Sequence, residues 1–185
     1  MDRLVICDEE GLRRLLERTS LKENQEWGTV LRNDGNTISQ ILDSFEAERI
    51  GLVVGKGKGF VVHDMTLGEG LGYTGTHHYH PKEDFDPSQN FLVHKEDRNC
   101  VDGKGIHLLT FNMPYGPEII AYDRNKTFIP ADRNNKHILL PVSEEQLREI
   151  VRNHERLPRN PIIASMELNE LYRREVSSRE AGDRN

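Results

Sequence analysis

Residues 106–122 read Ile106-His107-Leu108-Leu109-Thr110-Phe111-Asn112-Met113-Pro114-Tyr115-Gly116-Pro117-Glu118-Ile119-Ile120-Ala121-Tyr122. Two apolar runs rich in branched residues, separated by a turn of proline and glycine, are typical of neighbouring strands. Similar runs predict strands at residues 72–78 and 138–142, and a β-hairpin formed by residues 50–54 and 59–63. The turn of that hairpin, Gly55-Lys56-Gly57-Lys58, lacks the residue order of a phosphate-binding loop, so we interpret it as a turn.

Other segments have apolar residues at helical spacing. Asp8 is suited to cap a helix over residues 8–18. An amphipathic helix is predicted from residue 37 to 45 by the spacing of its apolar residues, which are Ile38, Ile41, Leu42 and Phe45. The polar stretch between these helices, residues 19–36, contains the turn signal Asn33-Asp34-Gly35-Asn36 and is expected to contain few strands.

Helix-start signals follow later in the chain. Pro87 and Ser88 predict the start of a short helix, and Ser143-Glu144-Glu145-Gln146 is a capping box that opens a longer one. A further helix is expected around residues 166–172, and residues 173–185 have too little apolar surface to be ordered. The elements together predict an α/β fold with a mixed, curved β-sheet flanked by helices.

Composition narrows the class of protein. The chain has 185 residues, of which 35% are hydrophobic, and a net charge of -6. This size fits one domain, the charge does not favour a nucleic-acid partner, and no apolar segment is long enough to span a membrane. Cys7 and Cys100 match no metal or redox spacing. We therefore expect a soluble, cytoplasmic protein without a disulfide framework.

The strand that ends at residue 80 carries the strongest functional signal. His78 and His80 lie two residues apart, so their imidazoles point to one face of a strand and can bind one metal ion. His77 points to the opposite face and is expected to pack or to form hydrogen bonds. His-x-His is frequent by chance, so the surrounding sequence decides its interpretation.

Thr76-His77-His78-Tyr79-His80-Pro81, followed by a six-residue loop and Ser88, resembles the signature of JAMM (JAB/MPN-type) metallopeptidases. Residues 47–55 resemble the helix-to-strand junction of that family, where its catalytic glutamate lies. The resemblance covers residues 37–128, about half of the chain. It implies a JAB/MPN-like domain at residues 37–142. We expect an N-terminal extension at 1–36 to pack on that core, and the helices at 143–172 and a disordered tail at 173–185 to follow it.

The resemblance also implies site residues and a reaction. His78 and His80 would bind zinc, Glu48 would act as general base, and Ser88 would stabilise the oxyanion. Zinc lowers the pKa of a bound water to about 7, so a carboxylate can take its proton as the water attacks an amide carbonyl. The implied substrate is a protein or peptide, including a ubiquitin-like conjugate.

The sequence departs from this family at the third metal ligand. The family has an aspartate three residues after the serine, where this sequence has Phe91. A catalytic zinc site normally has three protein ligands. The candidates for a replacement are Asp84, Asp86, Asn90 and His94.

Two alternatives remain open. A cupin barrel would use Gly72, His78, His80 and Asp84 as its first metal motif, but no histidine follows Pro114-Tyr115-Gly116 to complete a second motif, and the predicted helices do not suit an all-β barrel. The other alternative is a non-catalytic JAB/MPN-like binding or scaffold protein whose metal site has decayed.

Overall fold

The computed structural model of the chain describes residues 3–55, 61–81, 87–99, 105–113 and 115–156. The strands are β1 (Leu4–Ile6), β2 (Gly28–Asp34), β3 (Thr37–Ile41), β4 (Val53–Gly55), β5 (Val61–His63), β6 (Gly75–Tyr79), β7 (His107–Met113), β8 (Gly116–Tyr122), β9 (Thr127–Pro130) and β10 (Ile138–Val142). The helices are α1 (Glu9–Ser20), α2 (Ser44–Arg49), α3 (Met65–Gly70), α4 (Pro87–Phe91), α5 (Lys95–Asn99) and α6 (Glu144–Arg156).

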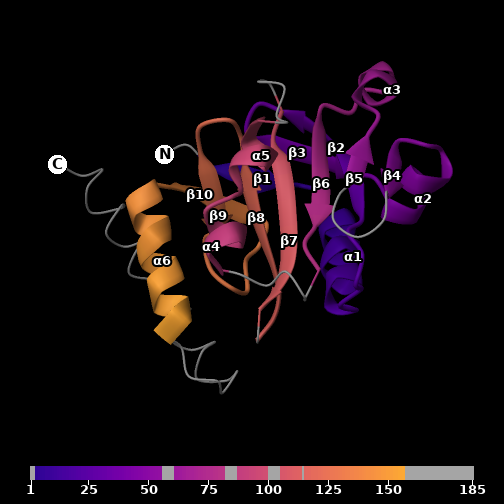
Figure 1. The fold of residues 1–185 in the computed structure, drawn as a ribbon. Coiled ribbons are helices and arrows are strands. Elements are labelled where there is room, and N and C mark those ends of the chain that lie inside the picture. Colours follow the sequence, from indigo (N-terminus) through magenta and orange to yellow (C-terminus); the bar gives the residue numbers. More distant parts are fainter. Residues whose placement is uncertain (1–2, 56–60, 82–86, 100–104, 114, 157–185) are drawn as a thin grey trace.

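Eight strands form a closed barrel in the order β1-β10-β9-β8-β7-β6-β2-β3, while β4 and β5 form a separate two-stranded sheet. The pairs β1/β3 and β6/β7 are parallel, and the other pairs of the barrel are antiparallel. The predicted mixed, curved sheet flanked by helices is therefore confirmed (Figure 1). The two parallel pairs distinguish it from an antiparallel jelly roll such as a cupin.

The interior of the barrel holds one apolar cluster with a side chain from each of its eight strands, among them Leu31, Tyr79, Leu108 and Ile119. Leu12 and Leu15 of α1 belong to the same cluster, because α1 packs on β7 and β8. Burial of this much apolar surface is the main stabilising contribution to the fold.

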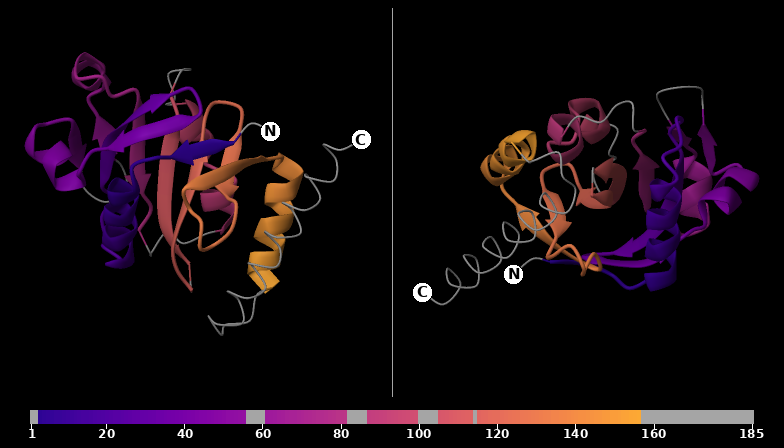
Figure 2. Two further views of the ribbon diagram at one scale, coloured as in Figure 1. Left: turned by 180° about the vertical axis from the view of Figure 1, so that it is seen from behind. Right: turned by 90° about the horizontal axis from the view of Figure 1, so that it is seen from below.

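Helices cover the outside of the barrel on two sides (Figure 2). Phe91 of α4 and Leu147, Ile150 and Val151 of α6 pack on a second apolar cluster formed by β7, β8 and β9. Ala47 of α2 packs on β2 in a third cluster. Both faces of these strands are thus buried, which explains their continuous apolar runs.

The expected helix over residues 37–45 is wrong, because residues 37–41 form β3 and a helix begins only at Ser44. The register of β2 and β3 explains the misleading pattern. Arg32 is paired with Gln40 and Asn33 with Ile38, so the pairing skips Ser39. A bulge of this kind shifts the alternation of side chains. Ile38 and Ile41 therefore both join the interior cluster with the spacing of a helix.

The expectation of a strand-poor connection at residues 19–36 is also wrong, because residues 28–34 form β2. Leu31 faces the interior, whereas the preceding Val30 packs with α2 on the outside. A strand that is buried on both faces lacks the alternation by which an exposed strand is found. β1 and β2, which lie in the predicted N-terminal extension, are strands of the barrel itself.

Several local predictions are confirmed. Asp8 caps α1 by accepting a hydrogen bond from the Gly11 amide, and α4 begins at Pro87. Ser143 and Gln146 form the reciprocal hydrogen bonds of a capping box at the start of α6. The predicted strands at 106–111, 118–122 and 138–142 correspond to β7, β8 and β10. The predicted hairpin strands at 50–54 and 59–63 correspond to the antiparallel pair β4 and β5, and residues 56–60 of its turn lie outside the described residues. The helix expected at 166–172 and the tail at 173–185 lie outside the described residues.

No helix among the described residues is both long and apolar enough to cross a bilayer.

Candidate metal centre

Strand β6 positions the two histidines of the predicted site. It lies between β2, with antiparallel pairing, and β7, with parallel pairing. Tyr79 points into the barrel, so its neighbours His78 and His80 lie on the outer side. His77 points to the opposite face, as predicted, and this face is the barrel interior. Its ring lies 4.9 Å from that of Trp27 and its Nε2 lies 2.8 Å from Thr110 Oγ1.

The two outward imidazoles face one another. His78 Nε2 lies 3.1 Å from His80 Nε2, and each side chain is 12% exposed. Two nitrogen ligands at about 2.1 Å from one tetrahedral zinc ion are about 3.4 Å apart. The observed spacing is therefore close to the spacing that a shared ion requires.

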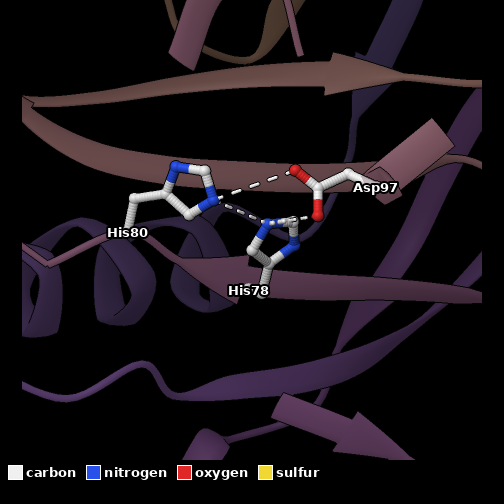
Figure 3. A group of neighbouring side chains, drawn as sticks. All are labelled: His78, His80 and Asp97. Atoms are coloured by element: carbon white, nitrogen blue, oxygen red, sulfur yellow. Dashed lines mark hydrogen bonds and ion pairs between the residues drawn. The ribbon is translucent and has the colours of Figure 1, made fainter. Parts of the chain in front are cut away.

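Asp97 brings a carboxylate to the same point. Its Oδ1 lies 3.8 Å from His78 Nε2 and its Oδ2 lies 3.9 Å from His80 Nε2. Figure 3 shows both rings directing nitrogen atoms toward this carboxylate, which comes from α5. One ligand atom from each of the three residues lies within 4.8 Å of the others, so the three residues could hold a metal ion.

Asn90 of α4 fixes the orientation of His80. Its Oδ1, which can only accept, lies 2.7 Å from His80 Nδ1, so Nδ1 carries the proton. In the neutral ring this leaves the Nε2 lone pair directed at His78 and Asp97. Histidine ligands of metal ions are commonly held by such a hydrogen bond from the other ring nitrogen.

Burial also sets the protonation states. Desolvation, with a smaller contribution from His80, lowers the pKa of His78 well below its usual value. The neutral imidazole that results at pH 7 is the form that binds metal. Desolvation raises the pKa of Asp97, and the neighbouring His80 opposes that shift. A cation at this point would therefore stabilise the ionised carboxylate.

Glu48, the predicted base, lies on α2, which packs on β2. Its Oε1 is 3.3 Å from Arg18 Nη1. The guanidinium of Arg18 in turn lies 4.3 Å from the ring centroid of Trp27. Figure 1 shows α2 and α5 on different sides of β6, and the Glu48 carboxylate is not part of the group formed by His78, His80 and Asp97. The described contact of Glu48 is therefore an ion pair with α1.

Ser88 lies in α4, the helix that also carries Asn90, and is half-buried. Phe91, at the family's ligand position, is fully buried, and its ring lies 5.2 Å from that of Phe111 in an edge-to-face arrangement. It is therefore a core residue.

Among the candidate replacements for the third ligand, His94 is paired with Glu96 and is exposed. Asn90 accepts a hydrogen bond from His80 Nδ1. Asp84 and Asp86 lie outside the described residues.

No sequence motif pointed to Asp97. It belongs to Lys95-Glu96-Asp97-Arg98-Asn99, a polar segment that is typical of a solvated helix. Its carboxylate was the only feature that could have suggested a ligand. The family pattern placed the third ligand at residue 91 instead. The contact depends on how the chain after α4 folds back over β6.

Comparisons with known proteins do not identify the chain. No protein-family model matches it, and no curated protein matches it. The solution structure of protein DSY2949 from Desulfitobacterium hafniense aligns with 76% of this chain and 90% of that chain, at 13% identity and a TM-score of 0.39.

Proposed function

We propose that this protein is a zinc-dependent hydrolase of amide bonds, a metallopeptidase or isopeptidase of the JAMM type in which Asp97 takes the place of the usual third ligand. The proposal depends on one observation: His78, His80 and Asp97 direct two imidazole nitrogens and a carboxylate oxygen at one point. Two histidines and one carboxylate form the ligand set of several catalytic zinc sites.

The chemistry of the donor set fits zinc. Neutral imidazole and carboxylate are both ligands that zinc accepts, and with three protein ligands a fourth position stays open. Zinc at this position would lower the pKa of a bound water to about 7 and would polarise an amide carbonyl. Asn90 would hold the tautomer of His80, and Ser88 on the same helix would donate to the developing oxyanion.

The sequence resemblance implies Glu48 as the proton acceptor, but the structure places its carboxylate outside the group formed by His78, His80 and Asp97. Its ion pair with Arg18 supports a structural role instead. The two roles predict different results for Glu48→Gln. If Glu48 is the base, the variant should lose amide hydrolysis; if Glu48 is structural, the variant should lose only stability. Glu46→Gln is the matched control, because Glu46 lies on the same helix and its ion pair among the described residues is a local one, with Arg49.

The proposed substrate is a protein or peptide, including an isopeptide conjugate of a ubiquitin-like protein. This proposal comes from the resemblance alone. It is tested by comparing a fluorogenic peptide with an isopeptide-linked conjugate as substrates.

The direct test is the zinc content of protein purified without a chelator, together with amide hydrolysis. We expect one zinc per chain, and loss of zinc and of activity in His78→Ala, His80→Ala and Asp97→Ala. His94→Ala is the control, because His94 is an exposed histidine near the site and is not part of the ligand group. Wild-type protein that binds no zinc would contradict the proposal.

A second candidate is a non-catalytic binding or scaffold protein of the same type. It is favoured by the burial of Phe91 at the family's ligand position and by the ion pair of Glu48. Zinc bound at full occupancy without hydrolysis of any amide substrate would favour it over the enzyme.

A further inference from the structure

Helix α5 carries Asp97 but has little that holds it in place. It spans only Lys95–Asn99, and none of its residues is buried. A helix this short is not stable by itself, and without an apolar face it gains little from packing. The position of the Asp97 carboxylate must therefore depend on specific contacts of α5.

Arg98, the residue after Asp97, makes such contacts. Its Nη1 donates to the carbonyl oxygens of Asp123, at 2.8 Å, and Lys126, at 3.3 Å. Its Nη2 donates to the hydroxyl of Thr127. One side chain thus joins α5 to the turn between β8 and β9 through three acceptors. The planar guanidinium is suited to such an arrangement because its donors have fixed directions.

The turn that accepts these bonds is itself well supported. Asp123 Oδ1 accepts hydrogen bonds of 2.7 Å from the amides of Asn125 and Lys126. The Asp123 amide donates to the Lys126 carbonyl at 3.0 Å, and Tyr122 is paired with Thr127 across the two strands. Arg98 is therefore attached to a turn that is held by its own hydrogen bonds.

Strand β8, which ends at this turn, also contacts one of the histidines. The Arg98 guanidinium lies 5.9 Å from the ring centroid of Tyr122. The Tyr122 ring is in edge contact with His78, at a centroid separation of 6.4 Å. The anchor of α5 and one of the two imidazoles are thus placed by the same part of β8.

We infer that Arg98 is a positioning residue that sets the metal affinity of the site by holding α5 so that Asp97 faces His78 and His80. The inference rests on the proposed function, because it requires that the three residues bind zinc. Arg98 itself does not touch the metal. It acts through the carboxylate next to it in the chain.

The test measures the zinc dissociation constant by competition with a chromophoric chelator, in wild type, Arg98→Ala, Asp97→Ala and the double variant. We expect Arg98→Ala to bind zinc about ten- to a hundred-fold more weakly, the range found when residues that support metal ligands are removed. In the Asp97→Ala background, Arg98→Ala should cause no further loss, because its effect passes through Asp97. Arg98→Lys, which keeps the charge but not the three-way contact, should fall between wild type and Arg98→Ala.

Two controls separate this role from a general effect on folding. Arg148→Ala removes an exposed arginine that pairs with Glu144 on α6, and it should leave the zinc affinity unchanged. The melting temperature of metal-free Arg98→Ala should lie within about 4 °C of wild type, because no residue of α5 is fully buried.

Three results would overturn the inference while leaving the proposed function intact: equal zinc affinity in wild type and Arg98→Ala, an additive loss in the double variant, or a fall in melting temperature large enough to show a loss of folding. Failure of the wild type to bind zinc would overturn the proposed function as well. The outcomes are therefore distinguishable.

Discussion

Asn90 accepts a hydrogen bond of 2.7 Å from Nδ1 of His80, and His80 presents its other nitrogen to His78 at 3.1 Å. The two contacts give the imidazole of His80 one orientation and one tautomer. Because Asn90 is fully buried in α4, this arrangement is fixed by the packing of that helix on the barrel. The short helix α4 therefore matters for the metal centre although it provides none of the three ligand atoms.

Asn90→Ala should weaken zinc binding about ten- to a hundred-fold, because His80 loses the acceptor that holds its Nδ1 proton. The measurement is a competition titration with a chromophoric chelator. Gln89→Ala is the matched control, since Gln89 is the exposed neighbour on the same helix. An Asn90 variant with unchanged affinity would show that the hydrogen bond does not orient the ligand.

Phe91→Asp restores the aspartate of the JAMM pattern in sequence but should not create a metal ligand. Phe91 is fully buried against Phe111, so the change removes a core side chain and buries a carboxylate. We expect a loss of about 4 kcal/mol or more in the free energy of unfolding, measured with urea. Phe91→Leu keeps an apolar side chain and should lose only about 1.5 kcal/mol. A well-folded Phe91→Asp variant with higher zinc affinity would contradict this prediction.

Gly75 permits the close contact of β6 with β7. A Cβ atom at this position would lie 2.2 Å from the carbonyl oxygen of Ile106 and 2.6 Å from Cδ1 of Leu31. Gly75→Ala should therefore destabilise the protein by about 3 kcal/mol and disturb the register that places His78. Gly70→Ala is the control, because a Cβ there meets no atom within 4 Å. Equal stability of the two variants in urea would refute the packing argument.

The stability of the metal-free protein should fall in mild acid. Burial lowers the pKa of His77 well below its usual value, with a smaller contribution from His63. The unfolded chain takes up a proton at His77 near pH 6.5, whereas the folded protein does so only at lower pH. The free energy of unfolding should therefore be nearly constant above pH 7. As the pH decreases below 6.5, it should fall by up to about 1.4 kcal/mol per pH unit for this group.

Thermal or urea unfolding between pH 8 and pH 5 measures this effect. His77→Gln can keep the hydrogen bond to Thr110 without a group that titrates, so its stability should depend less on pH. The same slope in His77→Gln and wild type would assign the acid sensitivity to other groups.

Much of the local structure could be predicted from sequence because it depends on neighbouring residues. Asp8 and the Ser143–Gln146 capping box mark the starts of α1 and α6, since their side chains bond amides within the first helical turn. The opposite directions of His77 and His78 follow from the alternation of side chains along a strand. These relations depend on neighbouring residues and not on contacts with distant parts of the chain.

The predictions were wrong where pairing with distant parts of the chain determines the structure. Ile38 and Ile41 have helical spacing only because the pairing of β3 with β2 skips Ser39, and no local signal distinguishes such a bulge from a helix. The adjacent apolar residues Val30 and Leu31 are both buried because β2 is covered on both faces. Closure into a barrel depends on the parallel pairing of β1 with β3, which joins two segments separated by α1 and β2.

In the candidate site, too, some features follow from the local sequence and others from contacts between distant segments. By itself, the sequence determined that His78 and His80 lie on one face of a strand, because that follows from backbone geometry. Only the tertiary structure brought Asp97 to them, attached α5 through Arg98 to the turn after β8, and placed Phe91 in the core. These contacts join segments that are distant in the sequence, and which of them form depends on the packing of the whole chain.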